Sequence, residues 1–330
     1  MKRCLFSTAK NLPPLDHVLP GLLAGTVGLL VGQGAIGKTF LVMQIAISTV
    51  LGRAIAASSG LHAGDGGSVL WPAPKPGPVL LILGEDIHDV VQHRQAALKN
   101  GLQLTDEEIE ILDSELEILS ATELGDDMRL VQKDPAGNIQ RGPFFDALLE
   151  LCRQRRLVIL DPLALLIAGV NENDNGQMTQ FMRVLTSIAA ETGCAILLPH
   201  HVGKTGAGGG EDWERSRGAS ALTTSVRLQL NLGPPSKDDM GQLGISPDEA
   251  GYWVRVAQVK ANYAAPKPHV WLRRGPGGVL AAYEPFSSSP EPAVANANTN
   301  SYAAAKDGLR PASAVIALER KKGGKKNGPF

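Results

Sequence analysis

A short glycine-rich stretch, "GQGAIGKT", contains residue types whose spacing can hold a polyphosphate. Gly32, Gly34 and Gly37 let the backbone curl so that successive N–H groups point inward, and a helix beginning near Lys38 adds the positive end of its dipole. The Lys38 ammonium can then reach the outer phosphates, and the Thr39 hydroxyl can ligate Mg²⁺. Apolar runs on both sides supply the strand and the helix that this pattern requires. We therefore predict a P-loop that binds ATP and Mg²⁺, rather than a glycine turn that matches by accident.

Two carboxylates follow apolar runs further along the chain. The run "LVILDP" places Asp161 at the carboxyl end of a buried strand, where α/β proteins bind ligands, and a Walker B role in the Mg²⁺ shell is favoured over an ordinary Asp-Pro turn. The residue after Asp161 is Pro162, whose side chain cannot accept a proton. A base for the attacking water must therefore come from elsewhere. The run "VLLILGED" offers Glu85, and a strand lying beside the P-loop strand would bring this carboxylate towards the γ-phosphate. The alternative for Glu85 is a solvated loop acid next to Asp86, which could cap the following helix.

A pair of histidines, His200 and His201, ends the apolar run "CAILLPHH". Adjacent residues of a strand point to opposite faces, which argues against a single metal ion held by both. We expect one imidazole to donate a hydrogen bond to the γ-phosphate and to sense its loss while the other packs. Two structural histidines are the alternative. His88 and His93 lie in a predicted helix without an H-E-x-x-H pattern, and no function is assigned to them.

The stretch after His201, "VGKTGAGGGEDWERSRGAS", is rich in glycine and locally basic through Lys204, Arg215 and Arg217. Loops at this edge of a sheet can line a channel for a nucleic-acid backbone. A solvated linker has the same composition, so the sequence leaves both interpretations open.

Charge is unevenly distributed along the 330 residues, whose formal net charge is −1. Residues 286–330 contain seven Lys or Arg and three Asp or Glu, and they are rich in Ser, Pro, Ala and Asn. We therefore predict an ATPase domain over residues 1–285 and a low-complexity, basic, disordered tail over residues 286–330. The acidic balance of the first region excludes a globally basic nucleic-acid surface, so any such contact must use local basic loops.

The cysteines and the longest apolar run indicate the compartment. Cys4, Cys152 and Cys194 are scattered without metal-binding spacing, which fits a reducing cytosol better than a disulfide framework. The run "FLVMQIAISTVLG" is shorter than the roughly 20 residues that a membrane span needs. We expect a cytoplasmic protein without a membrane partner.

The elements that must position these residues alternate between strands and helices, as in an α/β protein with a mostly parallel central sheet. Buried strands are expected at residues 26–32, 79–83, 157–161 and 194–201, and helices at residues 39–51, 87–99, 105–113, 143–156 and 179–193. Residues 116–120 and 128–140 are expected to form strands, the latter around a turn. Four further runs, within residues 226–284, predict shorter antiparallel strands at one edge.

Together, the P-loop, Glu85 after the second strand, Asp161 without an adjoining glutamate, and a strand ending in polar residues indicate a RecA-like core rather than an AAA+ core. The chain resembles the RepA-type hexameric replicative helicases of broad-host-range plasmids over about residues 13–281. The similarity lies in "PPLDHVLPGLLAGTVGLLVGQGAIGKT", "GPVLLILGED", "RRLVILD", "ETGCAILLPHHVGK", "SRGASALTTSVR" and "VAQVKANYAAPKPHVWLRR".

This resemblance implies an ATP-driven homohexameric ring that unwinds DNA by moving along one strand, for plasmid or mobile-element replication. It assigns nucleotide and Mg²⁺ contacts to Lys38 and Thr39, the base to Glu85, Walker B to Asp161 and the sensor motif to His200 and His201. Arg227 matches the position of the arginine finger, and the alternatives are that it is a surface arginine or that Arg217 is the finger instead. No primase-like segment is fused, so priming and loading would need separate proteins. The alternative function is a RecA-like ATPase stimulated by single-stranded DNA in repair, recombination or regulation, without processive unwinding.

Overall fold

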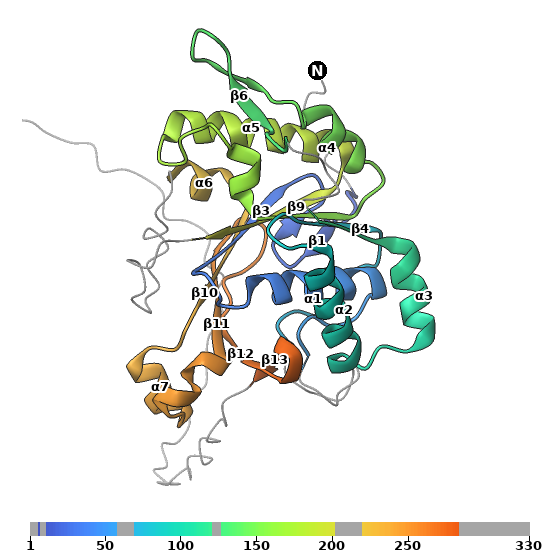
Figure 1. The fold of residues 1–330 in the computed structure, drawn as a ribbon, viewed down its shortest axis with the longest axis vertical. Helices are drawn as coiled ribbons and strands as arrows, with labels where there is room; N and C mark the ends of the chain where they lie inside the picture. Colours follow the sequence, from blue (N-terminus) through green and yellow to red (C-terminus); the bar gives the residue numbers. More distant parts are fainter. Residues whose placement is uncertain (1–5, 7–10, 58–68, 121–126, 202–219, 284–330) are drawn as a thin grey trace, which may run out of the picture. The chain divides into compact units, whose positions relative to one another are not determined.

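The central layer of the molecule is a nine-stranded, mostly parallel sheet (Figure 1). The computed structural model describes residues 6, 11–57, 69–120, 127–201 and 220–283. From one edge to the other, the strands follow the order β13-β12-β11-β10-β3-β9-β8-β4-β5. Their bounds are β3 (Val27–Gly32), β4 (Val79–Leu83), β5 (Leu116–Ser120), β8 (Leu157–Asp161), β9 (Ala195–His201), β10 (Leu228–Gly233), β11 (Trp253–Ala261), β12 (Val270–Arg274) and β13 (Leu280–Tyr283).

Helices cover both faces of the parallel part of the sheet (Figure 1). One face packs against α1 (Lys38–Leu51), α2 (His88–Gly101) and α3 (Asp106–Glu115). The other packs against α4 (Phe145–Leu151), the 3-10 helix η3 (Leu163–Ile167), α5 (Asn175–Thr192) and α6 (Ser220–Ser225). Because both faces of β3, β4, β8 and β9 are covered, these strands read as continuous apolar runs in the sequence, as predicted. The RecA-like α/β architecture is confirmed.

The antiparallel edge differs in one respect from the expectation. Strands β11, β12 and β13 are antiparallel, but β10 pairs in parallel with β3 and antiparallel with β11. After β9 the chain returns through α6 to the end of the sheet where the parallel strands begin, and such a crossover produces parallel pairing. β10 therefore joins the parallel core to the antiparallel edge.

Several smaller elements complete the described residues. Two hairpins, β1 (His17–Leu19) with β2 (Leu22–Leu23) and β6 (Val131–Lys133) with β7 (Ile139–Arg141), lie outside the main sheet. Helix α7 (Lys237–Leu243) and the 3-10 helices η6 (Pro247–Tyr252) and η7 (Pro276–Gly278) were not predicted. α7 begins with a capping box formed by Ser236 and Asp239. The spacing of these two residues is a sequence signal for the start of a helix. No helix within the described ranges is both long and apolar enough to cross a membrane.

Candidate functional site

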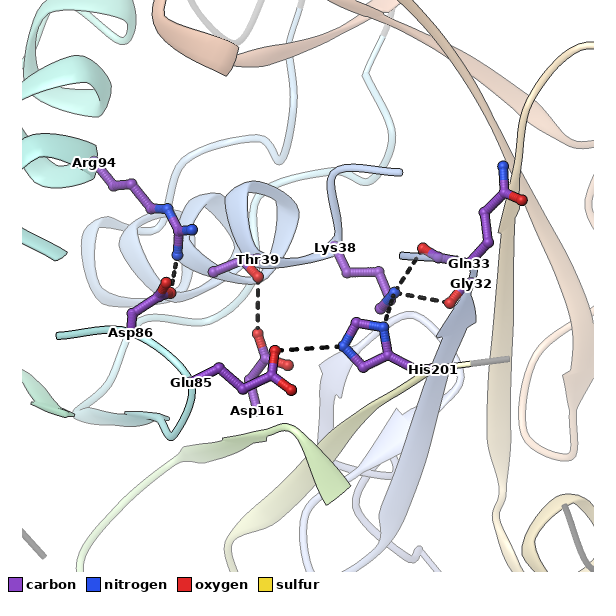
Figure 2. A network of polar contacts seen from close by, with 9 residues as sticks. All are labelled: Gly32, Gln33, Lys38, Thr39, Glu85, Asp86, Arg94, Asp161 and His201. Atoms are coloured by element: carbon purple, nitrogen blue, oxygen red, sulfur yellow. Dashed lines mark hydrogen bonds and ion pairs between the residues drawn. The ribbon is translucent and has the colours of Figure 1, made fainter. Parts of the chain in front are cut away.

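The glycine-rich loop lies where predicted, between the end of β3 and the start of α1 (Figure 2). Gly37 caps α1 with φ 106°, and Ala35 also has a positive φ of 62°. At Gly32, an added Cβ would lie 3.0 Å from Ile36 Cγ2 and 3.1 Å from Leu232 Cβ, so the chain needs glycine for this close approach. At Gly34, by contrast, a Cβ would have no heavy atom within 4 Å among the described residues. The loop is thus tightly packed at its start and open at Gly34.

Lys38 is the buried cation of the loop, with 4% of its surface exposed. Its Nζ donates hydrogen bonds to the carbonyl oxygens of Gly32 at 2.7 Å and Gln33 at 2.9 Å (Figure 2). Burial lowers the pKa of Lys38 to about 8, although the nearby carboxylates of Asp161 and Glu85 oppose the shift. The ammonium is therefore held by the carbonyls of the loop and lies near both carboxylates of the site.

Thr39 and Asp161 bring two oxygen ligands together from different elements. Thr39 Oγ1, in the first turn of α1, donates a hydrogen bond of 3.1 Å to Asp161 Oδ2 at the end of β8 (Figure 2). Asp161 is 7% exposed, and burial raises its pKa to about 6, against the stabilising influence of Thr39 and Lys38 on the carboxylate. A hydroxyl and a carboxylate side by side form the type of oxygen site that Mg²⁺ prefers.

Glu85 lies at the same edge of the sheet, but the position of its strand in the sheet differs from the expected one. We expected β4 beside the P-loop strand, but β9 and β8 lie between them. The parallel strands nevertheless end at one edge, and the Gly84 N–H donates a hydrogen bond of 2.6 Å to the Asp161 carbonyl oxygen, which fixes the chain beside β8. The Glu85 side chain is 63% exposed, and its Oε2 lies 3.7 Å from His201 Nε2 (Figure 2).

The two histidines at the end of β9 point to opposite faces, as predicted. His201 lies between the two charged groups of the site, with Nδ1 3.2 Å from Lys38 Nζ and Nε2 facing Glu85. Burial and the positive charge of Lys38 lower its pKa. His200 is 5% exposed, its Nε2 has no hydrogen-bond partner among the described residues, and burial lowers its pKa to about 4. The geometry therefore places His201, not His200, beside the phosphate loop.

Asp86 does not cap the helix that follows it, so that expectation is wrong. The N-cap of α2 is Ile87, which makes no side-chain cap bond. The Asp86 carboxylate instead accepts a hydrogen bond from Arg94, two turns into α2 (Figure 2). Arg94 also lies over the Phe40 ring, with Cζ 5.9 Å from the ring centroid, and its charge lowers the pKa of Asp161. The sequence analysis missed Arg94, since nothing in an eight-residue separation predicts the contact.

A second arginine missed by the sequence analysis supports the loop from outside. Arg274, at the end of β12, donates hydrogen bonds from Nη2 to the carbonyl oxygens of Ile36 at 3.1 Å and Ala35 at 3.4 Å. The helix behind the loop is fixed to the same hairpin, because Gln44 exchanges two buried hydrogen bonds with the backbone of Leu280. The antiparallel edge thus holds both the phosphate loop and its helix in place.

Arg227 lies far from the phosphate loop of its own chain. It is exposed and precedes β10, whose Leu228 pairs with Gly28 and whose Leu232 pairs with Gly32. Five residues of strand therefore separate Arg227 from the level of Gly32, roughly 17 Å at 3.3 Å per residue. Its backbone is fixed by bonds from its N–H to the Val27 carbonyl and from the Asn262 N–H to its own carbonyl. Arg227 cannot reach the site formed by its own Lys38.

The remaining predicted residues lie in other parts of the chain. Lys204, Arg215 and Arg217 lie outside the described residues, as do Cys4 and residues 286–330. Cys152 and Cys194 are buried and free. In the portion that the structure describes, no group of three or more His, Cys, Asp or Glu side chains could hold a metal ion. Any Mg²⁺ at this site would therefore use Thr39, Asp161 and the nucleotide's own phosphates, a set that suits an ion that keeps part of its water shell.

Solved structures share this fold at low sequence identity. One structure, described as an ATPase domain, matches with a TM-score of 0.50 and 15% identity, covering 79% of this chain and 86% of that one. A KaiC-like protein, PH0186, from Pyrococcus horikoshii OT3 matches with a TM-score of 0.50 and 12% identity, covering 82% of this chain and 100% of that one. Both likenesses concern the fold alone.

The sequence itself matches a known family. The profile of the AAA_25 family, described as an AAA domain, matches residues 6–207, which include the phosphate loop, Glu85, Asp161 and the histidine pair. The AAA label of the family is compatible with the RecA-like fold described above, which this chain shares with the two solved structures. This chain belongs to the AAA_25 family of AAA domains, built on a RecA-like P-loop ATPase fold.

Proposed function

We propose that this protein is an ATP-dependent DNA helicase that assembles as a homohexameric ring and moves along single-stranded DNA during plasmid or mobile-element replication. Separate initiator and primase proteins would load it and prime synthesis. The RecA-like ATPase fold supports nucleotide hydrolysis, and the resemblance to RepA-type helicases supports the finer assignment.

The proposed chemistry uses five side chains at one edge of the sheet. Lys38 binds the phosphates, and Thr39 with Asp161 holds Mg²⁺, which supplies positive charge to the phosphate oxygens. Glu85 orients the attacking water and accepts its proton, because its exposed carboxylate lies beside His201 at the same edge of the sheet. His201, between Lys38 and Glu85, is placed to detect the γ-phosphate through either neighbour.

The position of Arg227 is the observation that most supports a ring. Hydrolysis spreads negative charge over the phosphate oxygens, and an inserted guanidinium can accelerate such a reaction about 10³–10⁵-fold. Arg227 lies at the opposite end of the parallel strands from its own Lys38, so if it is the finger it must act on a neighbour's nucleotide. A head-to-tail arrangement in which each subunit serves the next closes into a ring when the rotation between subunits closes, and otherwise gives an open filament, which the assembly mass distinguishes.

The test combines three measurements on the full chain. ATP hydrolysis is measured with and without single-stranded DNA, the mass of the assembly is measured in solution, and displacement of one strand from a forked duplex is followed with ATP. Lys38→Ala is the inactive control. A hexamer that hydrolyses ATP faster with DNA and displaces the strand supports the proposal. Stimulation by DNA without displacement supports the alternative RecA-like ATPase, and a monomer indifferent to DNA contradicts both.

A further inference from the structure

One face of the antiparallel strands alternates arginine and aromatic side chains. In the pairing of β11 with β12, Trp253 lies opposite Arg273 and Arg255 lies opposite Trp271, and β13 places Tyr283 opposite Trp271. Residues paired across strands project from the same face of a sheet. We name these five residues the Arg/Trp face.

The Arg/Trp face lies outside both hydrophobic cores. Its reverse side packs into the core under α1 through Val254, Leu272 and Ala282. The core under α4, α5 and α6 contains no residue of β11, β12 or β13 among those that the structure describes. Figure 1 shows these strands extending away from the α4–α5 layer, with α7 beside the end of β11. The described helices of that layer therefore do not pack on the Arg/Trp face, although its two tryptophan rings are themselves buried.

One cation of this face, Arg273, lies over an aromatic ring. Trp253 is 5% exposed, its ring meets that of Tyr283 edge-on at 4.6 Å, and the Cζ of Arg273 lies 5.8 Å from the Trp253 centroid. Arg273 itself is exposed. Rigid rings beneath a guanidinium limit its motion and leave its N–H groups facing outward.

The neighbouring pair, Arg255 and Trp271, is connected differently, through His269. Trp271 is 5% exposed and meets the ring of His269 edge-on at 5.5 Å, and His269 Nδ1 lies 3.2 Å from Arg255 Nη2. The outer layer of the face is therefore positively charged and its inner layer is aromatic.

The strands that form the face contain no carboxylate between Glu249 and Glu284, which flank them. Residues 251–283 include five Lys or Arg and no Asp or Glu, in a chain whose net charge is −1. The carboxylate of Glu249, just outside this range, bonds Ser246, and the charge of Arg273 adds slightly to the lowering of its pKa. Two further aromatic residues, Tyr252 and Tyr263, are 56% and 38% exposed at the two ends of β11. The segment thus combines local positive charge with two exposed tyrosines that flank β11, outside the Arg/Trp face.

We propose that the Arg/Trp face binds the backbone of single-stranded DNA, with Arg273 and Arg255 contacting phosphates. Guanidinium groups recognise phosphate oxygens through paired hydrogen bonds, and a positively charged surface can follow the backbone of a single strand. Because both tryptophans are buried, any stacking with bases would use the exposed rings of Tyr252 and Tyr263. This inference rests on the proposed function and adds to it a contact surface separate from the glycine-rich loop after His201. The competing occupant is the acidic helix α3 of a second copy.

The experiment compares the wild type with the double variant Arg255→Gln/Arg273→Gln. Binding of a fluorescent oligo(dT) strand is measured from about 0.1 to 1 M salt, alongside basal ATPase activity and assembly mass. Arg183→Gln, an exposed arginine of α5, is the matched control. Each phosphate contact to a single strand contributes about 0.7 to the salt slope, so losing two should lower the slope by about 1.4 and the affinity about 10- to 30-fold at 0.1 M salt.

Each result has a definite meaning. The expected loss, with assembly and basal ATPase activity preserved and Arg183→Gln unaffected, supports the proposal. Wild-type affinity and slope in the double variant would overturn it while leaving the helicase proposal standing. Loss of assembly in the double variant would assign the face to contact between copies and would also overturn the proposal. A wild type that fails to bind single-stranded DNA would defeat the proposed function itself.

Discussion

Arg94 of α2 donates a hydrogen bond to the carboxylate of Asp86, the residue that follows Glu85. Both side chains are largely buried, with 24% and 17% exposed, and the guanidinium also lies over the ring of Phe40 in α1. The pair therefore ties the segment that presents the expected base to two helices of the site. A salt bridge of this kind fixes geometry more than it adds stability.

Breaking this pair should slow hydrolysis without preventing nucleotide binding. We expect Arg94→Ala to lower kcat about 10- to 100-fold with little change in KM, because a displacement of about 1 Å at a reacting group can cost that much. Asp86→Asn should act through the same contact, so the double variant should lose little more than either single one. Arg153→Ala, which breaks an exposed pair with Glu150, is the control. Additive losses, or a change confined to KM, would contradict the positioning role.

Lys38→Ala should abolish ATP turnover while leaving the fold intact. The ammonium is 4% exposed and is bonded to the carbonyls of Gly32 and Gln33, so the substitution removes a buried charge that burial disfavours. Turnover should fall by orders of magnitude because the variant lacks the positive charge that binds the outer phosphates. Phosphate release and thermal melting measure the two effects, and Lys99→Ala, at an exposed site of α2, is the control. Hydrolysis near the wild-type rate would refute the P-loop assignment.

Glu85→Gln separates binding from chemistry. The amide keeps the size and hydrogen-bonding capacity of the carboxylate but cannot accept a proton from water. ATP should therefore bind with about wild-type affinity and be hydrolysed at least about 100-fold more slowly, as for loss of a general base. Equilibrium binding of a fluorescent ATP analogue and single-turnover hydrolysis are the measurements, with Glu110→Gln on the surface of α3 as the control. If the variant no longer binds nucleotide, Glu85 belongs to the Mg²⁺ shell or to the structure of the loop.

Acid should destabilise the protein through His200. Its pKa is lowered to about 4, so the unfolded chain binds the proton more readily than the folded protein. The stability that depends on neutral His200 is complete above about pH 6.5 and is lost as the pH falls towards 4. At pH 5 the loss is about 2 kcal/mol. His200→Asn should therefore show a smaller drop in melting temperature from pH 7 to pH 5 than the wild type, and the exposed His93→Asn should not. Equal drops in all three proteins would disprove this account.

The sequence was sufficient for elements whose signals are local. The spacing of the P-loop predicted β3, the loop and α1 because strand, glycines and lysine are contiguous. The helix expected over residues 105–113 is α3, which begins with a capping box of Thr105 and Glu108. Strand alternation correctly separated His200 from His201. These properties depend on neighbours within a few residues.

Features that depend on topology were not predictable in the same way. Glu85 was expected beside the P-loop strand, but strand order is decided by packing between distant segments, which placed β9 and β8 between. Asp86 was expected to cap α2, but the contact with Arg94 formed instead, and the parallel pairing of β10 depends on the crossover before it. Arg274 reaches the phosphate loop from 238 residues away in the chain, beyond any local pattern.

Arg227 provides the sharpest test of assembly, because one chain cannot bring it to its own nucleotide. Its backbone is fixed between Val27 and Asn262, at the end of the parallel strands opposite the phosphate loop. If it serves a neighbour, Arg227→Ala should keep ATP binding and ring formation while turnover falls about 10³-fold or more. Mixing is the decisive measurement. Rings that combine Arg227→Ala subunits with Lys38→Ala subunits should regain part of the activity, because some interfaces then pair an intact Lys38 with an intact Arg227. Mixed rings that form fully and remain inactive would rule out Arg227 as the finger, and Arg217 would then be tested by the same mixing.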